Sequence, residues 1–330
     1  MFLQAFRGTV KASANFKASA DAEVLHKAMK GLGTDEAAIL QLLTARSNAQ
    51  RQEIKASYKT LFGKDLVHDL KGELGGKFET LVVALMTPPL TYDVTSLHHA
   101  IKGAGTDEKV LVEILASRTP QQVKDIIAAY KTEYDHDLEK DICGDTSGHF
   151  QRLLVILLQV TLILSSFLVT SLLLLHQKCF AFFQASRQTG IQEANIESDA
   201  QVSFREKLCN NPEWFFSVFD AYTKLSGYEM EESIKRETSG SLRALLLAVV
   251  KCARSVPSYF AETLYYAMKG AGTDDDTLIR VMVTRCEVDM LDIRAAFRRM
   301  FACSLHSMIK GDTNGDYRKT LLLLCGGDDA

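Results

Sequence analysis

A short glycine-containing motif occurs three times in this chain of 330 residues, and each copy is followed at one fixed distance by a carboxylate. The copies, which share the form Lys-Gly-x-Gly-Thr-Asp followed by an acidic residue, are 29–36, 101–108 and 268–275. The carboxylates, each 40 residues after the second glycine of its copy, are Glu73, Asp145 and Asp312. Such constant spacing predicts structural modules built on one plan.

The repeat extends beyond the glycines. An arginine follows the second glycine at one constant offset, an isoleucine comes two helical turns after the arginine, and an aromatic residue follows one turn later. These positions are Arg46, Arg118 and Arg285, then Ile54, Ile126 and Ile293, then Tyr58, Tyr130 and Phe297. We expect the arginines to pair with acids inside their own modules rather than to contact a ligand.

The modules are expected to be helical. In the first one, apolar residues recur at i, i+3 and i+4, which predicts helices over 22–30, 35–45, 49–62, 64–73 and 77–87. Thr34 suits the N-cap of the second helix, and Asp35 and Glu36 fall in its first turn. The alternative is that Thr34 and Glu36 form a second, weaker cation site. Only 5 prolines in the chain also favour helix. The predicted fold class is all-α, with four modules of about five helices each.

The third module is incomplete. Its late half, 236–240, matches the carboxylate segments 144–148 and 311–315, with Glu237 in the acidic position. Counting back 40 residues from Glu237 reaches Glu197 rather than a glycine, and no glycine loop, Thr-Asp-Glu helix start or matching arginine lies between 201 and 214. We therefore expect no cation site in this module.

A long run without any charged residue extends from Leu153 to Leu175. A helix of this length would cross roughly 30 Å of hydrocarbon, so a membrane anchor is one interpretation. The interpretation that we favour is the last helix of the second module fused to an insert, since removing 160–184 restores the expected linker. The predicted segments are an arm (1–15), modules at 16–88 and 89–159, the insert (160–184), a degenerate module (185–256) and a last module (257–328).

The motif chemistry points to a hard cation. Glycines allow the positive φ angles of a tight turn, which can aim successive carbonyl oxygens at one spot. In the first module these would be the carbonyls of Met29, Gly31 and Gly33, with Glu73 adding a bidentate carboxylate. These groups supply five oxygens, and Ca²⁺ takes six to eight, so water or an incoming ligand oxygen must fill the remaining positions. An incomplete all-oxygen shell suits Ca²⁺, whereas Mg²⁺ prefers strict octahedra and Zn²⁺ prefers Cys or His.

An incomplete shell has a functional consequence. It binds Ca²⁺ weakly alone and better when a phosphate oxygen completes it. Calcium can then join a protein of net charge −3 and pI about 6.3 to an acidic membrane, and several weak sites act together. Lys30, Lys102 and Lys269 are either headgroup contacts or solvated side chains. The same negative charge argues against nucleic-acid binding.

No catalytic motif is present. The chain lacks the Gly-x-x-x-x-Gly-Lys-Ser/Thr phosphate loop, the Gly-x-Ser-x-Gly elbow and the His-Glu-x-x-His pair, and its eight histidines are scattered. We expect neither an enzyme nor a small-molecule substrate. Seven cysteines without framework spacing fit a reduced, cytosolic chain, and residues 1–10 do not read as a signal peptide.

The motif Lys-Gly-x-Gly-Thr-Asp-Glu, with an acidic residue on a later loop of the same repeat, resembles the annexins over nearly all of 5–159 and 185–328. The resemblance implies four five-helix repeats in a curved, right-handed superhelical disc, the third incomplete, with calcium sites on the convex face. It implies calcium-dependent binding to phosphatidylserine-rich membranes, anticoagulant and phospholipase-inhibiting effects, trimers and two-dimensional arrays. The implied location is cytoplasmic and peripheral to membranes, with the extracellular surface as a further one.

The resemblance also assigns the site residues by position. Site one takes Met29, Gly31, Gly33 and Glu73; site two takes Ile101, Gly103, Gly105 and Asp145; site four takes Met268, Gly270, Gly272 and Asp312. The competing hypotheses are an integral membrane protein anchored by 153–175 and an ion-conducting assembly.

Overall fold

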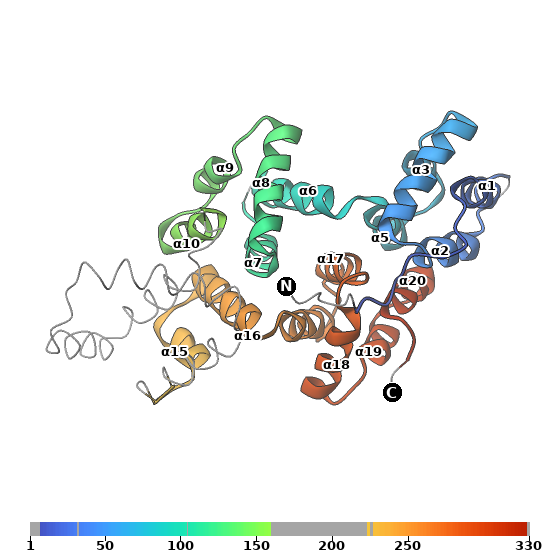
Figure 1. Cartoon of the computed structure of the whole chain (residues 1–330). Helices are drawn as coiled ribbons and strands as arrows, with labels where there is room; N and C mark the ends of the chain where they lie inside the picture. The colour runs from blue at the N-terminus through green and yellow to red at the C-terminus, as the bar shows by residue number, and fades with distance from the viewer. Residues whose placement is uncertain (1–6, 32, 104, 160–222, 225–226, 329–330) are drawn as a thin grey trace, which may run out of the picture. The chain divides into compact units, whose positions relative to one another are not determined.

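The structure is a computed structural model that describes residues 7–31, 33–103, 105–159, 223–224 and 227–328. Every regular element among them is a helix (Figure 1). The chain divides into two compact units, one of 1–92 with 257–330 and the other of 93–256. The predicted all-α class is confirmed.

The first unit contains the whole first module. Its helices are α1 (Ala18–Ala28), α2 (Glu36–Thr44), α3 (Asn48–Phe62), α4 (Leu66–Glu73) and α5 (Gly76–Met86). All five predicted helices are thus confirmed, with ends shifted by a few residues. α3 begins with a capping box in which Ser47 and Gln50 satisfy each other's backbone N–H groups, and it ends at Gly63 in the left-handed conformation.

The last module completes this unit with the part of α16 (Gly240–Met268) from Pro257 onward, α17 (Asp275–Arg285), α18 (Met290–Phe301), α19 (Leu305–Asp312) and α20 (Gly315–Cys325). Helices α2 and α5 pack against α20, and α5 also packs against α17. The repeated isoleucine and aromatic positions are buried in this unit, namely Ile54, Tyr58, Ile293 and Phe297. Apolar burial along these helix faces is the main favourable contribution to the fold.

The second unit contains the second module. Its helices are α6 (Pro89–Ile101, most of which lies in this unit), α7 (Glu108–Ser117), α8 (Pro120–Tyr134), α9 (Leu138–Asp145) and α10 (Gly148–Gln159). α10 contains the start of the uncharged run, and its Leu154 and Leu157 are at most 2% exposed. The beginning of the run is therefore core of a helical unit, which does not favour a lipid-facing anchor there. Residues 160–175 and the predicted insert lie outside the described residues.

The late half of the third module lies in the second unit as α15 (Met230–Glu237) and the first part of α16 (Gly240–Met268). Glu237 ends α15 as the other carboxylates end their helices, and Gly240 has φ 59°. The early half, where we expected no loop, lies outside the described residues.

Helix α16 is the one described helix that is long and apolar enough to span a bilayer, with a mean hydropathy of 1.3 in its best window. Its backbone leaves the helical region at Ser255 (φ −168°, ψ 107°), two residues before Pro257. Each part is shorter than the ~20 residues that a membrane-spanning helix needs.

The repeat arginines form internal ion pairs, as predicted. Arg46 bonds Asp21 at 2.5 and 3.0 Å, and Arg118 bonds Asp93 at 2.7 and 2.8 Å, each acid lying 25 residues before its arginine. In the last module that position holds an aromatic residue, and the arginine uses an acid on its other side. Arg285 bonds Asp289 at 2.8 and 2.6 Å while its guanidinium lies over the Phe260 ring.

Candidate metal sites

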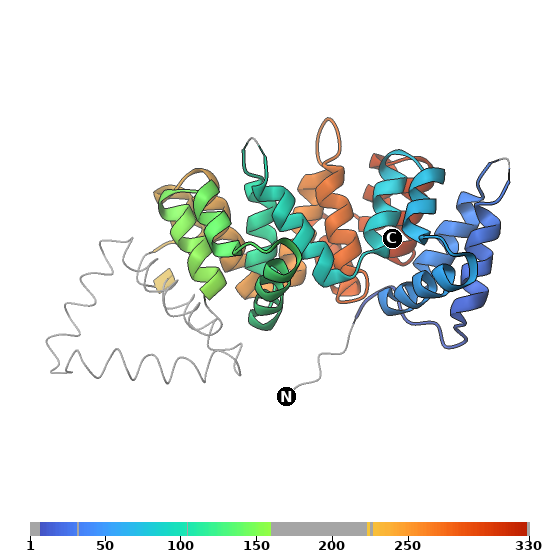
Figure 2. The ribbon, with the colours of Figure 1, turned by 90° about the horizontal axis from the view of Figure 1, so that it is seen from above.

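Each glycine motif forms the loop between the first two helices of its module. Both glycines have positive φ in every copy: 124° and 94° at Gly31 and Gly33, 140° and 106° in the second module, and 124° and 100° in the last. Side-chain-bearing residues rarely adopt such angles. In Figure 2 the loops of the first and last modules project from the same side of the first unit.

One backbone hydrogen bond closes every loop at its base. The N–H of the motif aspartate donates to a carbonyl in the last turn of the preceding helix. The pairs are Asp35 to Ala28 at 2.9 Å, Asp107 to Ala100 at 2.8 Å and Asp274 to Ala267 at 2.7 Å. The two ends of each loop are therefore held at nearly the same distance in all three modules. The residue between the two glycines, which is Leu or Ala, does not change this closure.

The first predicted ligand of each loop faces the core. These residues, Met29, Ile101 and Met268, are at most 9% exposed. Only their carbonyl oxygens remain as donors to an ion, as the sequence predicts. The buried side chains anchor the loop at its start, while the glycines stay exposed.

The three predicted carboxylates occupy equivalent places. Glu73, Asp145 and Asp312 are the last residues of α4, α9 and α19, and each is followed three residues later by a glycine with φ between 60° and 66°. None of the three has an ion-pair partner among the described residues. These acids are therefore available for a cation.

A threonine hydroxyl joins each carboxylate to its loop. The hydroxyl donates to a carboxylate oxygen at 2.6 Å in all three modules, from Thr34 to Glu73, from Thr106 to Asp145 and from Thr273 to Asp312. The structure thus brings together the two halves of each site that the 40-residue spacing predicted.

The prediction that Thr34 caps the second helix is wrong. Asp35 is the N-cap, and its carboxylate accepts the N–H of Ala38 at 2.9 Å. Asp107 and Asp274 cap α7 and α17 in the same way. The aspartate stands one residue nearer the helix, where its side chain meets the free N–H groups of the first turn. Sequence reasoning missed the threonine's actual partner, although the offset between the two is the same in all three modules and was a usable signal.

The donor set fits calcium. Among the described residues, no group of three or more His, Cys, Asp or Glu side chains converges on one point. A metal at these loops must take most of its ligands from backbone oxygens, with one carboxylate. Hard, oxygen-preferring Ca²⁺ accepts this set, whereas a typical Zn²⁺ site needs several Cys or His ligands.

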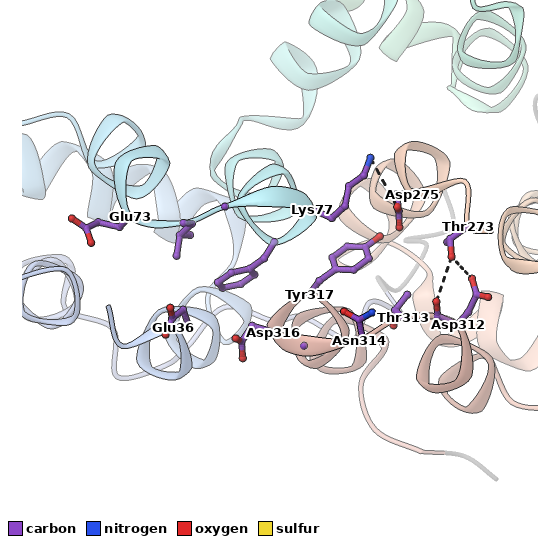
Figure 3. A pocket seen from close by; sticks show the side chains of 14 residues that line it. Glu36, Glu73, Lys77, Thr273, Asp275, Asp312, Thr313, Asn314, Asp316 and Tyr317 are labelled. Carbon is purple, nitrogen blue, oxygen red and sulfur yellow. Dashed lines mark hydrogen bonds and ion pairs between the residues drawn. The ribbon is translucent and has the colours of Figure 1, made fainter. Parts of the chain in front are cut away.

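An acidic hollow lies between the first and last modules of the first unit (Figure 3). It encloses about 520 Å³ and is lined by one lysine, Lys77, and by five carboxylates: Glu36, Glu73, Asp275, Asp312 and Asp316. Two of these carboxylates are the proposed ligands of sites one and four. The local field therefore attracts cations toward both sites, beyond what the small net charge provides.

The Tyr317 hydroxyl lies buried at this hollow. Burial first, and then the neighbouring Asp275 carboxylate, raise the pKa of Tyr317. Asp275 acts on the hydroxyl electrostatically, but no hydrogen bond of good geometry reaches it from the described residues. The neutral phenol therefore adds no charge to the acidic lining.

A smaller hollow beside the first loop holds a polar chain that the sequence analysis missed. His26 lies 3.2 Å from the Tyr58 hydroxyl, which donates to Asp69 at 2.8 Å. The second module repeats this with His98, Tyr130 and Asp141, whereas the last module has the apolar stack of Tyr265 and Phe301. Burial and the acceptor raise the pKa of both tyrosines.

The comparisons with known proteins agree with this architecture. The described residues form repeated helical modules, and the annexin family model matches residues 20–85, 92–157, 215–249 and 259–324. The chain belongs to the annexin family. The third matched segment is short because it covers only the late half of that module. The family is one of calcium-dependent phospholipid-binding proteins.

Individual relatives are similar over nearly their full length. Annexin A5 of Gallus gallus is 58% identical, with 98% of each chain covered, and annexin A5 of Macaca fascicularis is 56% identical, with 99% of each covered. The solved structure of chicken annexin V in complex with Zn²⁺ matches with a TM-score of 0.82 and 57% identity, covering 98% of this chain and 99% of that one.

Proposed function

We propose that this protein binds phosphatidylserine-rich membranes by calcium bridging. Site one would use the carbonyls of Met29, Gly31 and Gly33 with the Glu73 carboxylate, and sites two and four would use the corresponding residues. The observation that carries the proposal is the repeated assembly of a closed, positive-φ glycine loop with an unpaired carboxylate tethered to it.

The bridging follows from the ligand count. Three carbonyls and a bidentate carboxylate supply about five oxygens, and Ca²⁺ takes about six to eight. Lipid phosphate or carboxylate oxygens would complete the shell. Without the ion, an acidic headgroup would face the glycine loops and the acidic hollow, where repulsion opposes binding.

The wider role is part of this proposal. A protein recruited to a phosphatidylserine surface covers the lipid that clotting enzymes and phospholipases need, which gives anticoagulant and phospholipase-inhibiting shielding without catalysis. Trimers and two-dimensional arrays on the bilayer would strengthen the cover, since linked weak sites raise avidity. The proposed location is the cytoplasm, with peripheral membrane association when calcium rises, and the extracellular surface in addition.

Co-sedimentation with vesicles tests the proposal. The full chain is mixed with phosphatidylserine–phosphatidylcholine vesicles, with and without calcium, and with pure phosphatidylcholine vesicles as the control. We expect pelleting only with calcium and the acidic lipid, and full release on addition of EGTA. Retention in EGTA would contradict calcium bridging and would instead favour a directly inserted segment.

A further inference from the structure

We propose that Thr34, Thr106 and Thr273 are positioning residues that set the carboxylate of each calcium site before the ion arrives. This inference rests on the proposed function, since it concerns the same sites. Figure 3 shows the arrangement in the last module, where dashed lines join Thr273 to Asp312. The same 2.6 Å contact recurs in the first and second modules.

The hydroxyls are not needed for helix capping. Asp35, Asp107 and Asp274 accept the N–H groups at the starts of their helices, so the threonines have no role there. Each threonine directly follows a loop with two positive-φ glycines. Its hydroxyl contacts the carboxylate at the end of the third helix after that loop, and it does so in all three copies. In all three modules the contact ends on the acid that the proposed site uses, so it acts on the site itself.

The carboxylates have no competing ion pairs. Glu73, Asp145 and Asp312 each accept the threonine hydroxyl and form no salt bridge among the described residues. An ionised oxygen can accept a hydroxyl and still offer its other lone pair, and the second oxygen keeps both. The tether therefore orients the carboxylate toward the loop without consuming its capacity for the ion.

The bonding differs in detail between the modules. In the second and last modules, the threonine oxygen also lies 3.0 and 3.4 Å from the backbone carbonyl oxygen of the same aspartate. In the first module, the longer glutamate is held at its end. Thr106 and Thr273 thus fix main chain and side chain together, which compensates for the shorter reach of aspartate. Outer partners of this type typically change metal affinity by about 10–100-fold when they are removed.

The test follows each loop separately. The full ¹⁵N-labelled chain, without lipid, is titrated with CaCl₂ to saturation, while the amide signals of the six loop glycines report occupancy. The variants are Thr106→Val, which removes the hydroxyl and keeps the branched shape, and Thr106→Ser, which keeps the hydroxyl. Thr132→Val is the control, since its exposed hydroxyl bonds only within α8. Thr273→Val and Thr273→Ser repeat the experiment in the other unit.

We expect Thr106→Val to raise the half-saturating calcium for Gly103 and Gly105 by about 10–100-fold, with the other loops unchanged. Thr106→Ser and the control should stay near the parent, and all should unfold at the parent temperature in EGTA. A Val variant that binds like the parent, or a Ser variant as weak as Val, would overturn the inference alone. If the glycine amide signals of the parent chain do not change on addition of calcium, both the proposed function and this inference are wrong.

Discussion

Replacing Glu73, Asp145 and Asp312 together by their amides should raise the calcium concentration that half-saturates vesicle binding by about 10²–10⁴-fold. Each amide keeps the shape of its side chain but removes the charge and one strong oxygen ligand from its site. Because the sites act together on one surface, losing all of them also removes the avidity, which accounts for a factor of this size. Single amide variants should show much smaller shifts, since two sites remain.

A matched control separates ligation from general charge. The triple variant Glu23→Gln, Asp125→Asn and Glu133→Gln changes three exposed helical carboxylates and alters the net charge by the same amount. We expect its calcium curve to follow the parent. If the control shifts as far as the site variant, surface charge and not the loops governs binding, and the site assignment is wrong.

Replacing Arg51 by Met should destabilise the first unit by about 1–3 kcal/mol, the cost of leaving a buried carbonyl without its hydrogen-bond donor. Arg51 is 1% exposed, and its guanidinium donates to the carbonyls of Leu43 and Leu85 at 3.0 and 2.8 Å and to Glu287 at 3.3 Å. Burial lowers the pKa of Arg51, yet the network keeps its charge satisfied. Met fills the space but removes the donor to the Leu43 carbonyl, whereas the Leu85 carbonyl and Glu287 still accept hydrogen bonds from Asn48 at 3.2 and 2.7 Å.

Urea unfolding in EGTA measures this loss without a contribution from calcium. Lys59→Met, an exposed change on the same helix, should fall within about 0.5 kcal/mol of the parent. Arg51→Lys should be intermediate, because it restores the charge without the planar fork. A loss below about 1 kcal/mol for Arg51→Met would mean that its hydrogen bonds to helix ends contribute little to the stability of this unit.

Local periodicity was enough to predict the helices. Apolar spacing placed all five helices of the first module, because one buried face on a surface helix leaves a clear pattern. The glycine loops were equally predictable, since a glycine pair repeated before Thr-Asp indicates a backbone that other residues adopt poorly. The fixed 40-residue offset then identified the acids that the structure places at the loops.

The sequence was less informative where two residues compete for one role. Thr34 and Asp35 are both good caps, and only geometry shows that Asp35 caps α2 while Thr34 binds Glu73. Arg285 is a similar case. Its pairing was predicted, but the loss of the upstream acid to Phe260 moved the partner to Asp289, which no repeat offset indicates.

The acidic hollow could not have been predicted. Glu36 and Glu73 come from the first module, and Asp275, Asp312 and Asp316 from the last, at the other end of the chain. Each acid lies at or near a helix end, where an acidic residue is common for local reasons, so no motif predicts that the five share one cavity. Their meeting depends on the packing of α2 and α5 against the last module.

The most direct test of the account is to locate the ion. Crystals of the full chain grown or soaked with calcium should show metal in three loops, bonded at about 2.3–2.6 Å to backbone carbonyls and to Glu73, Asp145 or Asp312. Water or a headgroup analogue should complete each shell. If the loops are empty at saturating calcium, or if the three carboxylates turn away from a bound ion, calcium bridging by these residues is wrong.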